Sequence, residues 1–104
     1  MSVVVDFERV LERQREQAER EYDLALAREA VDECRRQVER REERWQLLIS
    51  IHDEVATDPR CAWAALLEPA MREARRDLDD AESAHDLALA TYLHLGGDPR
   101  EYKD

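Results

Sequence analysis

The sequence contains few residues that break helices. Its 104 residues include only two glycines and three prolines, and all five lie after Thr57. Tight turns draw heavily on Gly and Pro, so a sheet with many turns is not expected. The stretch before them is rich in Glu, Arg, Ala and Leu. This composition predicts one long α-helix over residues 6–57, with Asp6 as its N-cap.

Long apolar runs and clustered cysteines are also missing. No segment approaches the ~18 consecutive apolar residues of a membrane-spanning helix. The opening MSVVVDFERV lacks the basic and apolar regions of a signal peptide. Two cysteines, Cys34 and Cys61, do not make a disulfide framework. We therefore expect a soluble, cytoplasmic protein that does not bind membranes.

Positive charge is in the minority. The chain has 26 acidic residues against 16 Lys and Arg, which gives a net charge of −10. Phosphate contacts need a basic surface, so no direct binding of nucleic acid is expected. A protein with a basic surface is the partner that this charge favours. Charged residues make up 40% of the chain, close to the composition of coiled coils and long helices.

Apolar residues at heptad spacing predict how the helices pack. In the first helix, two rows run at seven-residue intervals: Leu24, Val31, Val38 and Trp45, and then Ala27, Cys34, Arg41, Leu48 and Val55. In a helix over residues 69–95, one seam alternates steps of three and four: Met71, Ala74, Leu78, Ala81, His85, Ala88, Tyr92 and Leu95. Together they predict an all-α, elongated antiparallel hairpin that forms a single domain over residues 1–104.

The turn of the hairpin carries two prolines. Asp58-Pro59 resembles an N-cap followed by Pro at the first helical position, which predicts a short helix over residues 59–67. Pro69 then starts the second long helix. The best-formed core is expected at this end, from Trp45, Leu48, Ile51, Val55, Trp63, Leu66, Leu67 and Met71. Gly96-Gly97 predicts the end of the helix, and the tail is residues 96–104. In it, Asp98-Pro99 can start one further turn through Tyr102, and residues 100–104 are expected to be frayed or to dock.

The two long helices differ in length, and this difference leaves an apolar stripe uncovered. Both helices rise equally per residue, so Leu95 is expected opposite residues 22–30. The preceding part of the first helix carries the stripe Phe7, Val10, Leu11, Ala18 and Tyr22. We expect a homodimer or a target protein to cover it. A break near residues 12–21, giving a three-helix bundle, is the alternative.

No group of residues predicts an enzyme, a cofactor or a metal site. Glu82-x-x-His85 has the spacing used in di-iron bundles, but such a site needs two of these motifs and two further glutamates. We interpret His85 as a residue of the packing seam. There is no Gly-rich phosphate loop, and the serines are scattered. Catalytic, cofactor-binding and metal-binding residues are therefore all predicted to be absent.

Several acidic residues are candidates for contact with a basic protein: Glu42, Glu43, Asp53, Glu54, Asp58, Asp79 and Asp80. Ordinary surface charge is the alternative interpretation. The resulting hypothesis is a small acidic inhibitor or antagonist, such as a phage anti-defence protein, an immunity protein or an antitoxin. The alternative is a coiled-coil assembly, adaptor or scaffold protein.

The chain also resembles the WXG100 secreted proteins loosely, in its length and in its expected helical hairpin. It departs from them at Trp63-Ala64-Ala65, where those proteins have Trp-x-Gly, and its turn lies later in the chain. The C-terminus lacks a clear Tyr-x-x-x-Asp/Glu signal. The resemblance implies a secreted helical hairpin as a third, weaker alternative.

Overall fold

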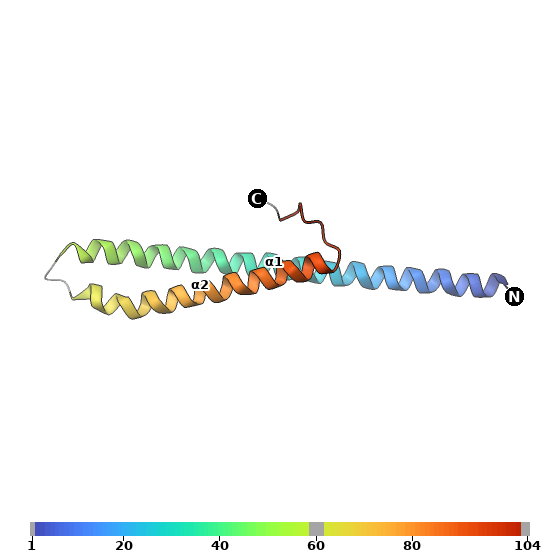
Figure 1. Ribbon diagram of the computed structural model, residues 1–104, viewed down its shortest axis with the longest axis horizontal. Helices are drawn as coiled ribbons and strands as arrows, with labels where there is room; N and C mark the ends of the chain where they lie inside the picture. Colours follow the sequence, from blue (N-terminus) through green and yellow to red (C-terminus); the bar gives the residue numbers. More distant parts are fainter. Residues whose placement is uncertain (1, 59–61, 103–104) are drawn as a thin grey trace.

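Two helices account for nearly all of the described chain. The computed structural model describes residues 2–58 and 62–102, and shows α1, Ser2–Ala56, running antiparallel to α2, Trp63–His94 (Figure 1). The molecule measures 90 × 23 × 14 Å and has a radius of gyration of 23.5 Å. A compact domain of about 100 residues has a radius of gyration of about 13 Å. The all-α, elongated hairpin is thus confirmed.

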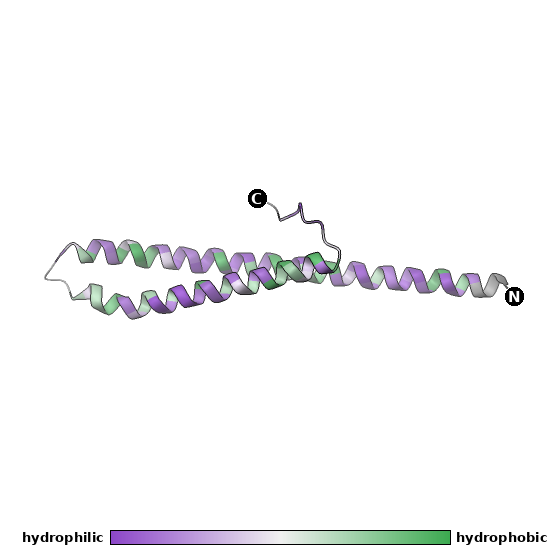
Figure 2. Cartoon of the chain, in the orientation of Figure 1, coloured by the Kyte–Doolittle hydropathy of each residue, from purple (hydrophilic) through white to green (hydrophobic). Residues whose placement is uncertain are grey.

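The helices pack along the seams that the heptad spacing predicts. The buried residues of α1 are Ala27 and Val31, and those of α2 are Ala74, Leu78, Ala81 and Tyr92. The remaining α1 seam residues, from Leu24 to Val55, are half-buried. Charged side chains occupy the outward surface, and Figure 2 shows hydrophilic residues recurring along both helices. The core is therefore a single narrow line of contacts between two helices.

The N-terminal boundary of α1 differs from the prediction. The helix begins at Ser2, so Asp6 lies inside it and is not its N-cap. The predicted start depended on one capping residue. No Pro or Gly separates Ser2 from Asp6, and one isolated capping signal does not stop a helix that can extend further. The other end is close to the prediction, because α1 stops at Ala56 and the Thr57 hydroxyl donates to the Glu54 carbonyl at 2.7 Å.

The predicted short helix and the second long helix form one element. α2 runs without a break from Trp63 to His94, and Pro69 lies inside it. Ala62 occupies the N-cap position, so Asp58 does not cap α2. The prediction for Pro59 falls on residues 59–61, which lie outside the described residues. Pro removes one backbone donor and crowds one carbonyl, a cost that a long helix of good helix formers can absorb.

The best-packed part of the core lies at the opposite end from the one predicted. Trp63 and Leu66 are 64% and 66% exposed, whereas Tyr92 is fully buried against Ala27 and Val31. Extending the α2 seam backward from Met71 in steps of four and three reaches Leu67 and Ala64, and both are half-buried. Trp63 and Leu66 fall between these positions and point outward. The prediction of a core at the turn was wrong for these two residues, because an apolar side chain is buried only where it lies in phase with the seam.

The C-terminus of α2 ends in a glycine motif, as predicted. The Gly97 N–H donates to the Tyr92 carbonyl at 3.0 Å, and the Gly96 N–H donates to the Leu93 carbonyl at 3.1 Å. This pair of bonds is the Schellman arrangement, which needs a left-handed residue, and Gly96 has φ +94°. The chain then turns back toward α1.

Residues 98–102 follow the glycine motif, and Glu101 and Tyr102 contact α1. The Tyr102 hydroxyl donates to Asp32 Oδ1 at 3.1 Å, and its ring meets the Tyr92 ring edge-on, with centroids 5.2 Å apart. Glu101 accepts hydrogen bonds from the Tyr92 hydroxyl and, at 3.1 Å, from Arg28. We call residues 98–102 the C-terminal clasp. Burial, followed by the neighbouring Asp32, raises the pKa of Tyr102 to about 12.

Candidate interaction surfaces

The N-terminal part of α1 has no partner within the described chain. Every side chain from residue 6 to residue 23 is exposed, because α2 and the clasp reach only as far as Leu24. We call residues 6–23 the arm, and it projects beyond the hairpin in Figure 1. The predicted stripe is on it, with Phe7 62%, Leu11 43% and Tyr22 65% exposed. The length mismatch is therefore confirmed, and no break divides α1.

The predicted acidic residues are all exposed, but they do not form one patch. Glu42, Glu43, Asp53 and Glu54 lie on α1, Asp58 lies just after it, and Asp79 and Asp80 lie on α2. Adjacent residues on a helix point roughly 100° apart, so Asp79 and Asp80 face different sides of α2. Asp79 pairs with Arg75 at 3.2 Å. Their use by a partner stays a prediction.

A denser acidic region surrounds Asp79 and Asp80 on α2. Residues 77–86 contain five acids and no Lys or Arg: Asp77, Asp79, Asp80, Glu82 and Asp86. We call this region the acidic segment. Within the described residues, Asp77 pairs with Arg44 at 3.4 Å, but no cation pairs with Asp80, Glu82 or Asp86. The sequence prediction missed Glu82 and Asp86, although ten residues without Lys or Arg were a usable signal.

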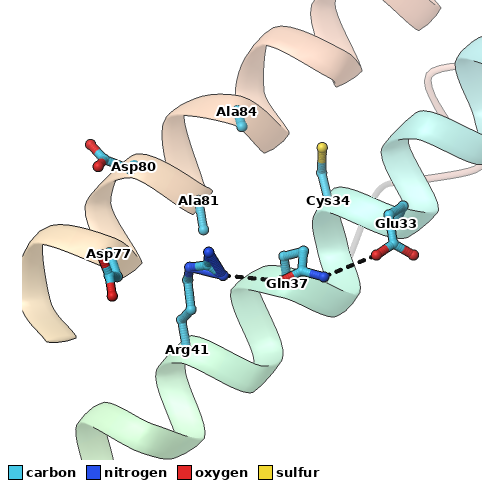
Figure 3. Close-up of a pocket in the computed structure, with 8 residues that line it drawn as sticks. All are labelled: Glu33, Cys34, Gln37, Arg41, Asp77, Asp80, Ala81 and Ala84. Atoms are coloured by element: carbon cyan, nitrogen blue, oxygen red, sulfur yellow. Dashed lines mark hydrogen bonds between the residues drawn. The ribbon is translucent and has the colours of Figure 1, made fainter.

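One edge of the acidic segment borders a groove between the helices. The groove has a volume of about 250 Å³, and Figure 3 shows its lining residues: Glu33, Cys34, Gln37 and Arg41 from α1, and Asp77, Asp80, Ala81 and Ala84 from α2. Within it, Gln37 donates to Glu33 at 2.9 Å, and Arg41 donates to Gln37 at 3.0 Å.

The Glu33 carboxylate of this groove is favoured in its charged form. The hydrogen bond from Gln37, followed by the interaction with Arg36, lowers the pKa of Glu33. Arg41 interrupts the apolar row of α1. Its side chain lines this groove between the helices, where its guanidinium donates to Gln37. An added basic side chain could lie beside Asp80, while the alanines at this edge leave room for it.

The tip of the hairpin exposes a second apolar group. Leu47, Ile51, Trp63 and Leu66 are each at least 37% exposed. Beside them, Trp45, His52, Glu68, Met71, Arg72 and Arg75 line a shallow hollow of about 400 Å³. Arg75 lies over the Trp45 ring at 5.8 Å from its centroid, which covers part of that side chain. Sequence reasoning placed most of this group in the core.

Neither metal-site geometry nor a membrane-spanning segment occurs in the described residues. No three His, Cys, Asp or Glu side chains of residues 2–58 and 62–102 come together as a metal site. His85, from the Glu-x-x-His spacing, is half-buried in the seam. Neither described helix contains an apolar window long enough to cross a membrane.

Comparison with known proteins gives no relative. No family model matches the chain, and neither a curated protein nor a solved structure is significantly similar to it.

Proposed function

We propose that the protein is a non-enzymatic, acidic protein-binding module whose partner presents a basic surface. The observation that carries the proposal is the acidic segment of α2. Its carboxylates lie on one helix, and three of them form no ion pair within 4.0 Å in the described chain. Unpaired charges held on one helix steer and orient an oppositely charged partner at little entropic cost.

The most concrete form of this function is inhibition or antagonism. A small hairpin of 12.2 kDa with net charge −10 can cover a basic functional surface and thereby block it. Glu33 and Asp80 would contribute at the edge of the groove, and Glu42 and Glu43 are the predicted contacts on α1. Phage anti-defence, immunity and antitoxin proteins are the classes that this description fits.

Neutralising the unpaired acids tests the proposal. Proteins captured by the wild type from the cells that express it are identified by mass spectrometry, and their affinities are measured by calorimetry. The variant Asp80→Asn/Glu82→Gln/Asp86→Asn is expected to weaken binding at least 10-fold, and raised salt is expected to weaken wild-type binding.

The matched control removes the same number of charges from α1. Glu19→Gln/Asp23→Asn/Glu29→Gln removes the same number of negative charges, and these three side chains are exposed. It is expected to bind within about two-fold of the wild type, since long-range charge falls off over about 8 Å at physiological salt. Equal losses in both variants, or none in either, would end the proposal.

The arm supports a second candidate function, that of a coiled-coil assembly or scaffold protein. An exposed stripe with two aromatic residues on a single helix is an unusual feature for an isolated chain. If self-association uses this stripe, the hairpin bodies become the units of an assembly.

A further inference from the structure

We propose that the arm binds the arm of a second copy, antiparallel, about a two-fold axis between Gln14 and Arg15. This surface is separate from the acidic segment, so the proposal does not rest on the one above. Phe7 and Leu11 are 62% and 43% exposed, although they are among the largest apolar side chains in the arm. Their burial requires a second helix, and α2 does not reach them.

The stripe faces a side of α1 that α2 leaves open. At roughly 100° per residue, Phe7, Leu11, Ala18 and Tyr22 lie within a narrow arc of the helix. The middle of this arc is roughly 160° around α1 from the middle of the seam at Leu24, Ala27 and Val31. A longer α2 would therefore not cover the stripe. A helix from another chain can approach there without meeting α2.

Four of the five stripe residues, all except Val10, have a spacing that is the same in both directions. Steps of four, seven and four residues separate Phe7, Leu11, Ala18 and Tyr22. In an antiparallel pair centred between Gln14 and Arg15, Phe7 faces Tyr22 of the second copy, and Leu11 faces Ala18. Aromatic residues then meet at both ends, and a large residue meets a small one in between. An isologous contact requires this kind of self-complementarity.

A hollow on the arm fits this register. Glu8, Leu11, Glu12 and Arg15 surround a space of about 270 Å³. Their spacing of i, i+3, i+4 and i+7 is that of the four-residue hole that receives a side chain in coiled-coil packing. The proposed axis places Gln17 and Ala18 of the second copy over this hole. The small Ala18 side chain lets the two backbones approach closely.

Charge favours the antiparallel sense over the parallel one. Each chain has a net charge of −10, and a parallel pair would hold two acidic hairpin bodies side by side. In the antiparallel pair the bodies start at opposite ends of the joined arms, about 30 Å apart at 1.5 Å per residue. This separation is several Debye lengths at physiological salt, so the repulsion is screened.

Light scattering over a wide concentration range tests the association. The wild type is expected to shift from 12.2 kDa toward twice that mass as its concentration rises. Leu11→Glu is expected to stay at 12.2 kDa with an unchanged helical circular dichroism spectrum. The matched control is Leu87→Glu, since Leu87 is 71% exposed on α2 and gains the same charge. A monomeric wild type, or equal behaviour of the two variants, overturns the proposal.

Disulfide trapping tests the orientation. Two chains are prepared in a Cys34→Ser/Cys61→Ser background, one with Leu11→Cys and one with Ala18→Cys. They are then mixed and oxidised. The antiparallel register is expected to give the mixed dimer, since these two positions face each other. Residue 11 lies about 10 Å along the axis from residue 11 of the second copy, beyond the ~7 Å reach of a disulfide. A dimer formed by Leu11→Cys chains alone would show the parallel arrangement and overturn the proposed register.

Discussion

Tyr92 is the residue on which the C-terminal half of the hairpin depends. Its ring is fully buried, contacts the Tyr102 ring edge-on and lies beneath the Arg28 guanidinium, 6.0 Å from its centroid. Its hydroxyl donates to Glu101, so a buried polar group is satisfied. One aromatic side chain thus joins α1, α2 and the tail.

Gly97 allows this arrangement because it has no side chain. A Cβ at this position would overlap the Tyr92 ring. We expect Gly97→Ala to lower the free energy of unfolding by about 1–3 kcal/mol through overpacking. Thermal unfolding followed by circular dichroism measures the loss.

Gly96→Ala is the comparison for this prediction. A Cβ at Gly96 meets no atom within 4 Å, so its cost of about 1 kcal/mol comes from the positive φ alone. Only Gly97→Ala should also change the near-ultraviolet signal of the tyrosines. The packing argument fails if both variants leave that signal unchanged.

Tyr102 gives the clasp a signature at high pH. Its pKa is raised to about 12, whereas a free tyrosine titrates near 10. The unfolded chain therefore loses this proton first, and stability that is complete below about pH 10 is lost between about pH 10 and 12. Absorbance at tyrosinate wavelengths should show one late step that Tyr102→Phe removes. A titration without that step would contradict a docked tail.

At the scale of elements, α2 is held by one line of small and medium side chains. Ala74, Leu78 and Ala81 are buried at steps of four and three, and the opposite face of α2 is exposed to solvent. Two packed helices have no second layer, so each buried residue carries a large share of the stability.

Position along α2 should therefore matter more than residue type. Leu78→Ala, at 3% exposure, is expected to lower the free energy of unfolding by about 2–5 kcal/mol. Leu66→Ala, at 66% exposure, should change it by less than about 0.5 kcal/mol. Urea unfolding of both variants decides the point. Similar losses of unfolding free energy in the two variants would mean that the hairpin tip is part of the core after all.

Pro69 is the weakest position of α2. It lies inside the helix and is exposed, so replacing it removes no core contact. Pro69→Ala restores one backbone donor and is expected to raise stability by roughly 1–2 kcal/mol, after the lost rigidity of the unfolded chain is allowed for. Pro69→Gly is the control, since its greater chain entropy should give a smaller gain. An unchanged urea midpoint in Pro69→Ala would contradict the prediction.

At the scale of the whole molecule, the fold divides into a two-helix body and a one-helix arm. The body has a seam, a C-terminal clasp and an acidic segment, whereas the described contacts of the arm are all within its own helix, such as the hydrogen bond from Gln17 to Glu21. A single helix of this length is marginal in water without a partner. The arm is thus the part most sensitive to association.

Hydrogen exchange should separate these two parts. In dilute protein, amides of residues 6–22 are expected to exchange faster than those of residues 27–48, which pack on α2. Raising the concentration should slow exchange in the arm and leave the body unchanged. Leu11→Glu is the control in which the arm stays fast. Uniform protection in dilute wild type would contradict an uncovered arm.

The sequence by itself determined the helical class, the antiparallel hairpin, both packing seams and the uncovered arm. These follow from local and periodic signals: the lack of Gly and Pro before Thr57, the heptad rows and the equal rise of two helices. The acidic segment can also be recognised in the sequence, since it is a run of ten residues without Lys or Arg.

Only the tertiary structure decided where the core is densest. Trp63 and Leu66 are strongly apolar, but they fall out of phase with the seam, while Tyr92 is buried because the tail returns over α1. That return depends on contacts between residues 70 or more positions apart, such as Tyr102 with Asp32, and no local pattern encodes them. The structure likewise shows that α2 continues through Pro69, where the local preference of proline predicted a helix boundary.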